Sequence, residues 1–135
     1  MRKFVVDASA VLHLAATELK VPAAHKLLAP TLLRSQTLSA LHEAVQRGDV
    51  AADVARERLV RIAKMPIRLL GDAVLRRRAW DLADRFGWAS TYDAEYVALT
   101  QLQADAFVTL DARLARTVQG IVEVATMDAL TRKAR

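Results

Sequence analysis

The stretch KFVVDASAVL, residues 3–12, contains an apolar run, a carboxylate and the start of a predicted helix. Residues 4–6 are apolar and rich in β-branched side chains, which is typical of a strand covered on both faces. The run ends on Asp7, and a helix is predicted from Ser9 to Ala16. Because ligands of open α/β sheets bind at the carboxyl ends of the strands, Asp7 lies where a cation-dependent site would be built. The alternative is that Asp7 serves only as the cap of the helix.

A second apolar strand with the same kind of ending is predicted near the end of the chain. Residues 106–110 read Ala-Phe-Val-Thr-Leu and are followed by Asp111 and by a predicted helix at residues 113–118. Asp7 and Asp111 therefore share one context, at the end of a buried strand and just before a helix. We expect both carboxylates at the carboxyl edge of the sheet.

The rest of the chain alternates short apolar strands with amphipathic helices. Such alternation predicts an α/β fold with a parallel sheet and helices on both of its faces. Residues 29–33 are expected to be extended, because the residue before a proline is disfavoured in a helix. Further helices are expected at residues 21–28, 35–47, 49–64, 72–87 and 92–103, and further strands at residues 67–70 and 121–124.

The composition limits the class of protein. The 135 residues are 53% hydrophobic and 26% charged, which predicts one globular domain over residues 1–135. The absence of cysteine excludes disulfides and thiolate sites and favours a reducing cytoplasm. No apolar run approaches the roughly 20 residues that span a bilayer, and no secretory leader is visible, so we expect no membrane association. The net charge of +5 favours a polyanionic partner, either nucleic acid or an acidic protein.

A third candidate acid, Asp93, lies in the first turn of a predicted helix. We expect it to share the inward face of that helix with Val97 and Thr100, whereas Glu95 is expected to face solvent. An acid on the inward face of an apolar helix is costly unless it is paired or coordinated. The alternative is that Asp93 only interacts favourably with the helix dipole.

Convergence of Asp7, Asp93 and Asp111 would require a cation or protons. Two carboxylates about 4 Å apart repel each other by roughly 4 kcal/mol at an effective dielectric constant of about 20. Ligands that are all oxygen suit Mg²⁺ or Mn²⁺, and such an ion activates water for attack on a phosphodiester. A basic surface around the site would hold the phosphate backbone.

Other chemistries fit the sequence less well. It contains no glycine-rich phosphate loop and no G-x-S-x-G segment. His13, His25 and His42 are not spaced as metal ligands and are interpreted as surface or packing residues. The phosphatase motif that begins with an Asp at the end of a strand needs a second Asp two residues later, where this chain has Ser9.

Three segments resemble the signature segments of PIN-domain ribonucleases, and most closely those of the VapC toxins of bacterial type II toxin–antitoxin systems. They are VVDASAV at residues 5–11, TYDAEYVAL at residues 91–99 and VTLDARLA at residues 108–115. The resemblance implies a PIN-like three-layer α/β/α sandwich with a short central parallel sheet. It also implies an endoribonuclease that cleaves structured RNA with water activated by Mg²⁺ or Mn²⁺, held by Asp7, Asp93 and Asp111. The class of RNA, whether tRNA, rRNA or mRNA, is left open.

The resemblance further implies a homodimer and a VapB-like antitoxin that keeps the enzyme inactive. In the family, the helix pair that corresponds to residues 35–47 and 54–64 clamps the C-terminal segment of the antitoxin. Apolar residues near the joint of these helices, including Val50 and Val60, are expected to be incompletely covered by a lone domain.

One position departs from the family pattern. Where the family usually carries a glutamate early in the helix, this chain has Gln36, which we count as a fourth catalytic residue. In that helix Leu38, Leu41 and Val45 are expected to be buried, with Gln36 and Glu43 on the opposite face. Glu43 is two turns from Gln36, about 10.5 Å along the axis, and is the other candidate for the fourth acidic position. The alternative function is therefore a PIN-fold RNA- or partner-binding protein with weak or no nuclease activity.

Overall fold

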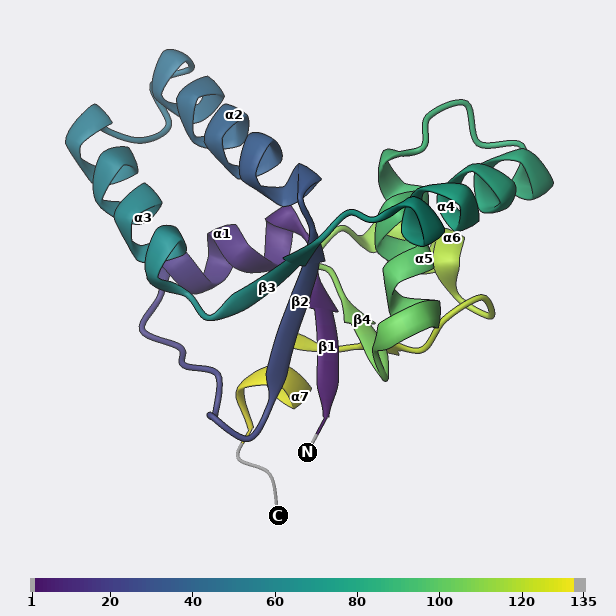
Figure 1. The fold of residues 1–135 in the computed structure, drawn as a ribbon. Helices are drawn as coiled ribbons and strands as arrows, with labels where there is room; N and C mark the ends of the chain where they lie inside the picture. The colour runs from purple at the N-terminus through teal and green to yellow at the C-terminus, as the bar shows by residue number, and fades with distance from the viewer. Residues whose placement is uncertain (1, 133–135) are drawn as a thin grey trace.

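The computed structural model describes residues 2–132 and contains one parallel β-sheet (Figure 1). Its strand order is β3-β2-β1-β4-β5, and every strand runs parallel to its neighbours. The chain therefore adopts the predicted α/β fold with a short central parallel sheet. The strands are β1 (Lys3–Val6), β2 (Lys26–Pro30), β3 (Ile67–Leu70), β4 (Ala106–Val108) and β5 (Val124–Ala125).

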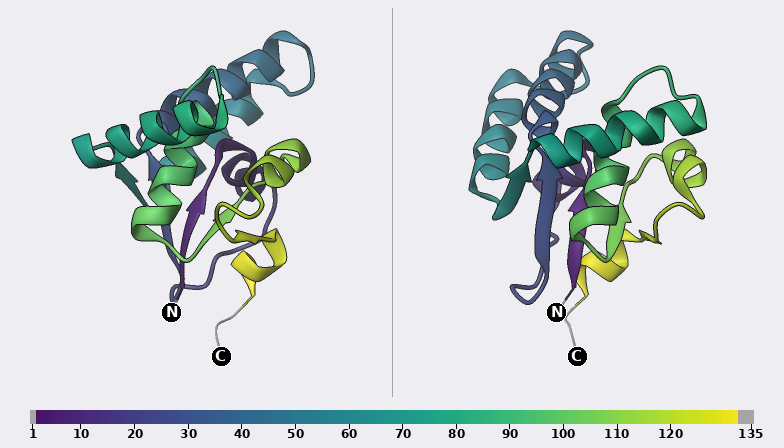
Figure 2. Two further views of the ribbon diagram at one scale, coloured as in Figure 1. Left: turned by 90° about the vertical axis from the view of Figure 1, so that its right-hand side faces the viewer. Right: turned by 45° about the vertical axis from the view of Figure 1, so that its right-hand side comes forward.

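Helices cover both sides of the sheet, which gives the three-layer arrangement that we expected. In Figure 1, α1, α2 and α3 lie on one side and α4, α5 and α6 on the other. Figure 2 shows that α2 and α3 form a helical hairpin that extends past the carboxyl edge of the sheet. No helix within residues 2–132 is long and apolar enough to cross a bilayer. The helices are α1 (Ala8–Ala16), α2 (Leu32–Gln46), α3 (Ala52–Lys64), α4 (Ala73–Phe86), α5 (Tyr92–Gln103), α6 (Ala112–Val118) and α7 (Met127–Thr131).

The central strands form the core, as their apolar runs predict. Residues 4–6 of β1 and 106–108 of β4 have no exposed surface. Val5 is in register with Leu28 of β2 on one side and with Phe107 of β4 on the other. Because β1 lies between two parallel partners, its last residue and that of β4 end at the same edge of the sheet.

The prediction of a helix at residues 21–28 is wrong, since the structure has a loop followed by β2 there. The backbone turns before the strand, where the N–H of His25 donates to the carbonyl oxygen of Pro22 at 3.0 Å. Residues 27–30 are then buried between β1 and β3. A short apolar run that is buried on both faces has no periodicity that distinguishes a strand from a helix. Here the run forms a strand because it pairs with both β1 and β3.

The helix after β2 begins earlier than predicted, and its buried face is rotated. It starts at Leu32, and its buried residues are Leu33, Thr37 and Leu41. The Thr37 hydroxyl donates to the carbonyl oxygen of Leu33 at 2.9 Å, so this buried polar group has a hydrogen-bond partner. Leu38, which we expected to be buried, is 57% exposed. The rotation leaves Gln36 half-buried at the boundary between the two faces.

Three smaller differences concern the ends of the chain and of its strands. Strand β4 ends at Val108, two residues earlier than predicted, and β5 occupies Val124–Ala125. Helix α7 was not predicted from the sequence, and it begins at a cap in which the Thr126 hydroxyl oxygen accepts from the N–H of Ala129 at 3.1 Å.

Candidate active site

Asp7 is buried directly after β1, and three donors hold its carboxylate. Its Oδ1 accepts from the Ser9 hydroxyl at 2.6 Å and from the N–H of Ala10 at 3.0 Å. Its Oδ2 accepts from the Thr109 hydroxyl at 2.5 Å. The capping interpretation is thus confirmed, because the Ala10 contact caps α1. Capping does not exclude a second role, since a carboxylate offers about four lone-pair sites and only three are used.

The hydroxyls of Ser9 and Thr109 tie the ends of β1 and β4 together. While Ser9 donates to Asp7, its oxygen accepts from the N–H of Leu110 at 2.8 Å. The Thr109 oxygen likewise accepts from the N–H of Asp111 at 3.1 Å. Neither Ser9 nor Thr109 was predicted from the sequence to contact an acid. The signal that would have found both is a hydroxyl within two residues of each strand-ending acid.

Asp111 begins α6 and shares a hollow with Asp93. Its Oδ1 accepts from the N–H groups of Arg113 and Leu114, at 3.0 and 3.1 Å, and so caps this helix. Within residues 2–132, its Oδ2 accepts no hydrogen bond. The hollow has a volume of about 360 Å³, and its lining includes Asp93, Asp111, Arg113 and Ser90.

The three predicted acids lie within electrostatic range of one another. The pKa of Asp93 is raised above its ordinary value, first by partial burial in the hollow and then by the charges of Asp111 and Asp7. Arg113 opposes this and lowers the pKa. Asp93 is nevertheless exposed to solvent, so it lines the hollow without being buried on an inward face as predicted.

The three acids do not form a complete metal-binding site. Within residues 2–132, no group of three or more His, Asp or Glu side chains is close enough together to hold one ion. The chemistry of the donors does suit Mg²⁺ or Mn²⁺, because all are oxygens and their mutual repulsion would be relieved by a cation. Mg²⁺ keeps several waters and needs only one or two carboxylates from the protein. The oxygens best placed for this are those of Asp93 and the free Oδ2 of Asp111, with Asp7 beside them.

Gln36 is held by Tyr96, a contact that the sequence analysis did not predict. The Tyr96 hydroxyl donates to Oε1 of Gln36 at 2.6 Å. The pKa of Tyr96 is raised, first by burial and then by the charges of Asp7, Glu95 and Asp93, so the hydroxyl keeps its proton. Because Asp7 and Asp93 act on Tyr96, Gln36 lies beside the acidic site. Glu43, farther along α2, is exposed.

The expectation that Glu95 faces solvent is wrong. Glu95 is half-buried, and burial raises its pKa, while the charge of Arg76 lowers it. The cause is α4, which packs along α5 and covers this face of the helix. Sequence periodicity assigns one buried face to a helix, and α5 has two, one against the sheet and one against α4.

Comparison with known proteins assigns the family. No protein-family model matches the chain. It is 33% identical over 118 residues to the VapC ribonuclease Mb0985 of Mycobacterium bovis, an alignment that covers 85% of this chain and 91% of that protein. The chain belongs to the VapC family of PIN-domain ribonucleases. The ribonuclease VapC9 of Mycobacterium tuberculosis matches with the same identity and coverage. The family expectation drawn from the three segments is therefore confirmed.

A solved structure supports the fold of this VapC-family chain independently. The crystal structure of PAE2754 from Pyrobaculum aerophilum superposes with a TM-score of 0.73 and covers 96% of this chain and 93% of that one. The two sequences are 24% identical, so this likeness concerns the fold alone.

We expect Asp93→Asn to raise the thermal midpoint of the metal-free protein. The raised pKa means that folding disfavours the charged carboxylate, so the wild type loses stability at pH 7. Since Asp93 is exposed on one side, the gain is small, roughly 1–4 °C. It should vanish as the pH falls below the ordinary carboxyl pKa of 3.8, where wild-type Asp93 is neutral in both states. Thermal melts with EDTA at pH 7 and pH 3.5 measure this, and a lower midpoint for the variant at pH 7 would contradict it.

Proposed function

We propose that this VapC-family chain is the toxin of a toxin–antitoxin pair and an endoribonuclease that cleaves structured RNA. It acts as a single PIN domain over residues 1–135 and uses Mg²⁺ or Mn²⁺, which Asp7, Asp93 and Asp111 would bind directly or through the waters that such an ion keeps. The observation that carries the proposal is that Asp93 and Asp111 line one open hollow, and that the pKa of Asp93 is raised, first by burial and then by the charges of Asp111 and Asp7. When bound, the ion supplies a Lewis acid and activates the attacking water.

The chain's own residues position the reaction. Ser9 and Thr109 fix the Asp7 carboxylate from both sides, so it keeps one orientation as the substrate binds. Arg113 lies in the lining of the hollow and offers a guanidinium to a phosphate of the RNA backbone. With its carbonyl oxygen bound to Tyr96, Gln36 has its amide N–H groups left to donate to a phosphate oxygen or to a bound water.

The direct test is cleavage of total bacterial RNA by the purified chain. We expect cleavage with Mn²⁺ or Mg²⁺ and none after EDTA, with activity restored when the metal is added in excess. RNA binding without cleavage under every metal condition would overturn the enzyme assignment. It would favour the alternative of a binding protein, which Gln36 motivates because the site carries one negative charge less than the family pattern.

The partners and location that we propose follow from the family. A VapB-like antitoxin holds the enzyme inactive, and the protein works in the cytoplasm, where its RNA substrate is found. Exposed apolar side chains on the helix pair α2–α3 support a protein partner there, since Leu38 is 57% and Val60 53% exposed.

We also expect a homodimer in solution. Besides the α2–α3 surface, α4 exposes Trp80 to 68% and Val74 to 58%, and a second copy of the chain could cover these side chains. Light scattering at micromolar concentration should give a mass of about twice the 14.9 kDa of one chain. A mass of one chain across that range would contradict the dimer without affecting the fold or the acidic site.

A further inference from the structure

A cavity larger than the acidic hollow lies at the other edge of the sheet from the acids. Its volume is about 770 Å³, and it is lined by the amino ends of β1, β2 and β3 and by the loop at residues 19–23. Figure 1 shows this loop between α1 and β2, on the same side of the sheet as α3. Apolar side chains supply most of the wall, among them Leu14, Val21, Leu27 and Met65. Neither the VapC assignment nor the proposed nuclease activity uses this cavity.

Four cationic side chains stand around this apolar cavity. Lys3, Lys20, Lys26 and Arg68 all belong to its lining and are exposed, and the lining contains no Asp or Glu. None of the four forms an ion pair with another side chain in residues 2–132. Asp105, which lies outside the lining, accepts from the backbone N–H of Lys3 at 2.7 Å. The wall of the cavity is therefore mainly apolar, and its Lys and Arg side chains face no acid in the lining.

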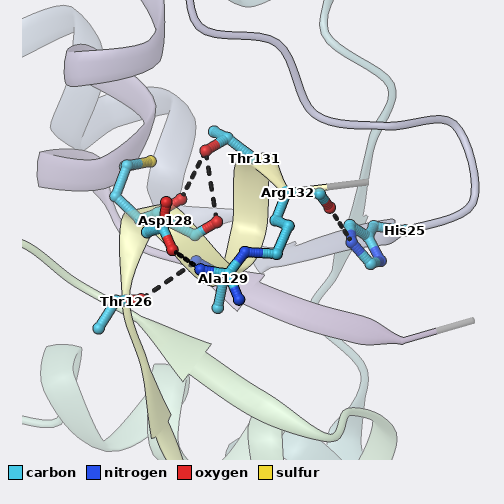
Figure 3. Close-up of polar contacts among 7 residues, drawn as sticks. His25, Thr126, Asp128, Ala129, Thr131 and Arg132 are labelled. Atoms are coloured by element: carbon cyan, nitrogen blue, oxygen red, sulfur yellow. Dashed lines mark hydrogen bonds and ion pairs between the residues drawn. The ribbon is translucent and has the colours of Figure 1, made fainter. Parts of the chain in front are cut away.

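One wall of the cavity is anchored to the C-terminal part of the fold (Figure 3). His25, which is part of the lining, has its Nε2 at 3.0 Å from the carbonyl oxygen of Arg132. Because a carbonyl only accepts, this nitrogen carries the proton. The imidazole ring also packs edge-on against Phe4 of β1, with 5.1 Å between ring centroids. The loop before β2 is thus fixed at its end, and the space beside it is a built cavity.

We infer that this cavity binds a small amphipathic carboxylate, with its hydrocarbon chain inside and its carboxylate among the four cations. The volume lies within the roughly 300–1,000 Å³ of small-molecule sites. Apolar burial supplies affinity, and the cations select an anion over a neutral molecule of the same shape. A helical peptide is about 10–12 Å wide and is a poorer fit than a single chain.

The test compares two probes on the full-length chain by ¹H–¹⁵N NMR titration. Octanoate should shift the amides of residues 19–28 and 65–68 and bind about tenfold tighter than octan-1-ol, since each surface charge pair adds only a few-fold. Lys26→Gln/Arg68→Gln, which changes two exposed residues of the lining, should remove most of that preference for the anion. Val21→Trp, which fills the cavity, should weaken both probes.

Arg56→Gln/Arg77→Gln is the matched control, because it also removes two exposed charges but lies outside the cavity. It should bind octanoate as the wild type does. Equal binding of octanoate and octanol, unchanged octanoate binding by Lys26→Gln/Arg68→Gln, or no shifts at these amides would each overturn the inference. The inference would also be overturned if an acidic peptide of Glu and Leu shifted these amides and octanoate did not. RNA cleavage is not a readout here, so failure of this inference is separate from failure of the proposed nuclease.

Discussion

Asp93→Asn and Asp7→Asn should each reduce the rate of RNA cleavage by at least about 100-fold. Loss of a residue that only supports a metal ligand typically lowers activity about 10- to 100-fold, and loss of a metal-binding carboxylate should lower it more. The fold should survive both changes. Asp93 is partly exposed, and Asn retains an oxygen that accepts from the N–H of Ala10, as Asp7 does. The measurement is the initial rate of cleavage of total RNA with saturating Mn²⁺. Expression of either variant should also allow normal growth where the wild type is toxic.

Asp81→Asn provides the matched control, since it removes an exposed acid on α4 that lies outside the hollow. It should cleave RNA at the wild-type rate. Equal cleavage by wild type, Asp7→Asn and Asp93→Asn would remove the acids from the mechanism. Equal toxicity of all three on expression would indicate that the protein acts by binding or sequestration instead.

The sequence predicted the centre of the fold well, because the strands that form it are apolar on both faces. Runs such as residues 4–6 and 106–108 are short, and residues 4–6 are rich in β-branched side chains, which favours strands in the middle of a parallel sheet. Their ends then locate Asp7 and Asp111 at one edge with no further information. The same reasoning from apolar runs to buried strands failed for residues 27–30, since the flanking residues gave no indication of where that run begins.

Details of the site depend on contacts between distant segments, which periodicity does not encode. The hydrogen bond from Tyr96 to Gln36 joins positions 60 residues apart, and that from Thr109 to Asp7 joins positions 102 apart. Glu95 is covered by α4, so its partial burial depends on how two helices pack. The residue types suggested the chemistry, whereas the hydroxyls that orient the acids appeared only in three dimensions.

The contact between Tyr96 and Gln36 leads to a second large expected effect. An amide in place of the family's acid leaves the site with one negative charge less, and Mg²⁺, which gives up its waters reluctantly, should be affected most. Mn²⁺ tolerates a neutral ligand better than Mg²⁺ does and generally binds such a mixed set of protein ligands more tightly. The wild type should therefore cleave RNA faster with Mn²⁺ than with Mg²⁺ at equal concentration.

Gln36→Glu should restore the missing charge in the right place. The Tyr96 hydroxyl, which keeps its proton, donates to Oε1 of Gln36 at 2.6 Å and would donate to a carboxylate oxygen equally well. We expect the Mg²⁺ concentration for half-maximal cleavage to fall about tenfold, with a smaller change for Mn²⁺. Metal-titrated cleavage of total RNA measures both. In Gln36→Glu/Tyr96→Phe the gain should shrink, because nothing then orients the new carboxylate.

Glu43→Gln distinguishes the two possible positions of the fourth acid. Glu43 is exposed on α2, two turns from Gln36, and neither of its oxygens lines the hollow that Asp93 and Asp111 share. If Gln36 occupies the fourth position, Glu43→Gln should cleave RNA like the wild type with either metal. If Gln36→Glu leaves the metal requirement unchanged while Glu43→Gln abolishes cleavage, then Glu43 must reach the metal, and α2 must move towards the acids when RNA binds.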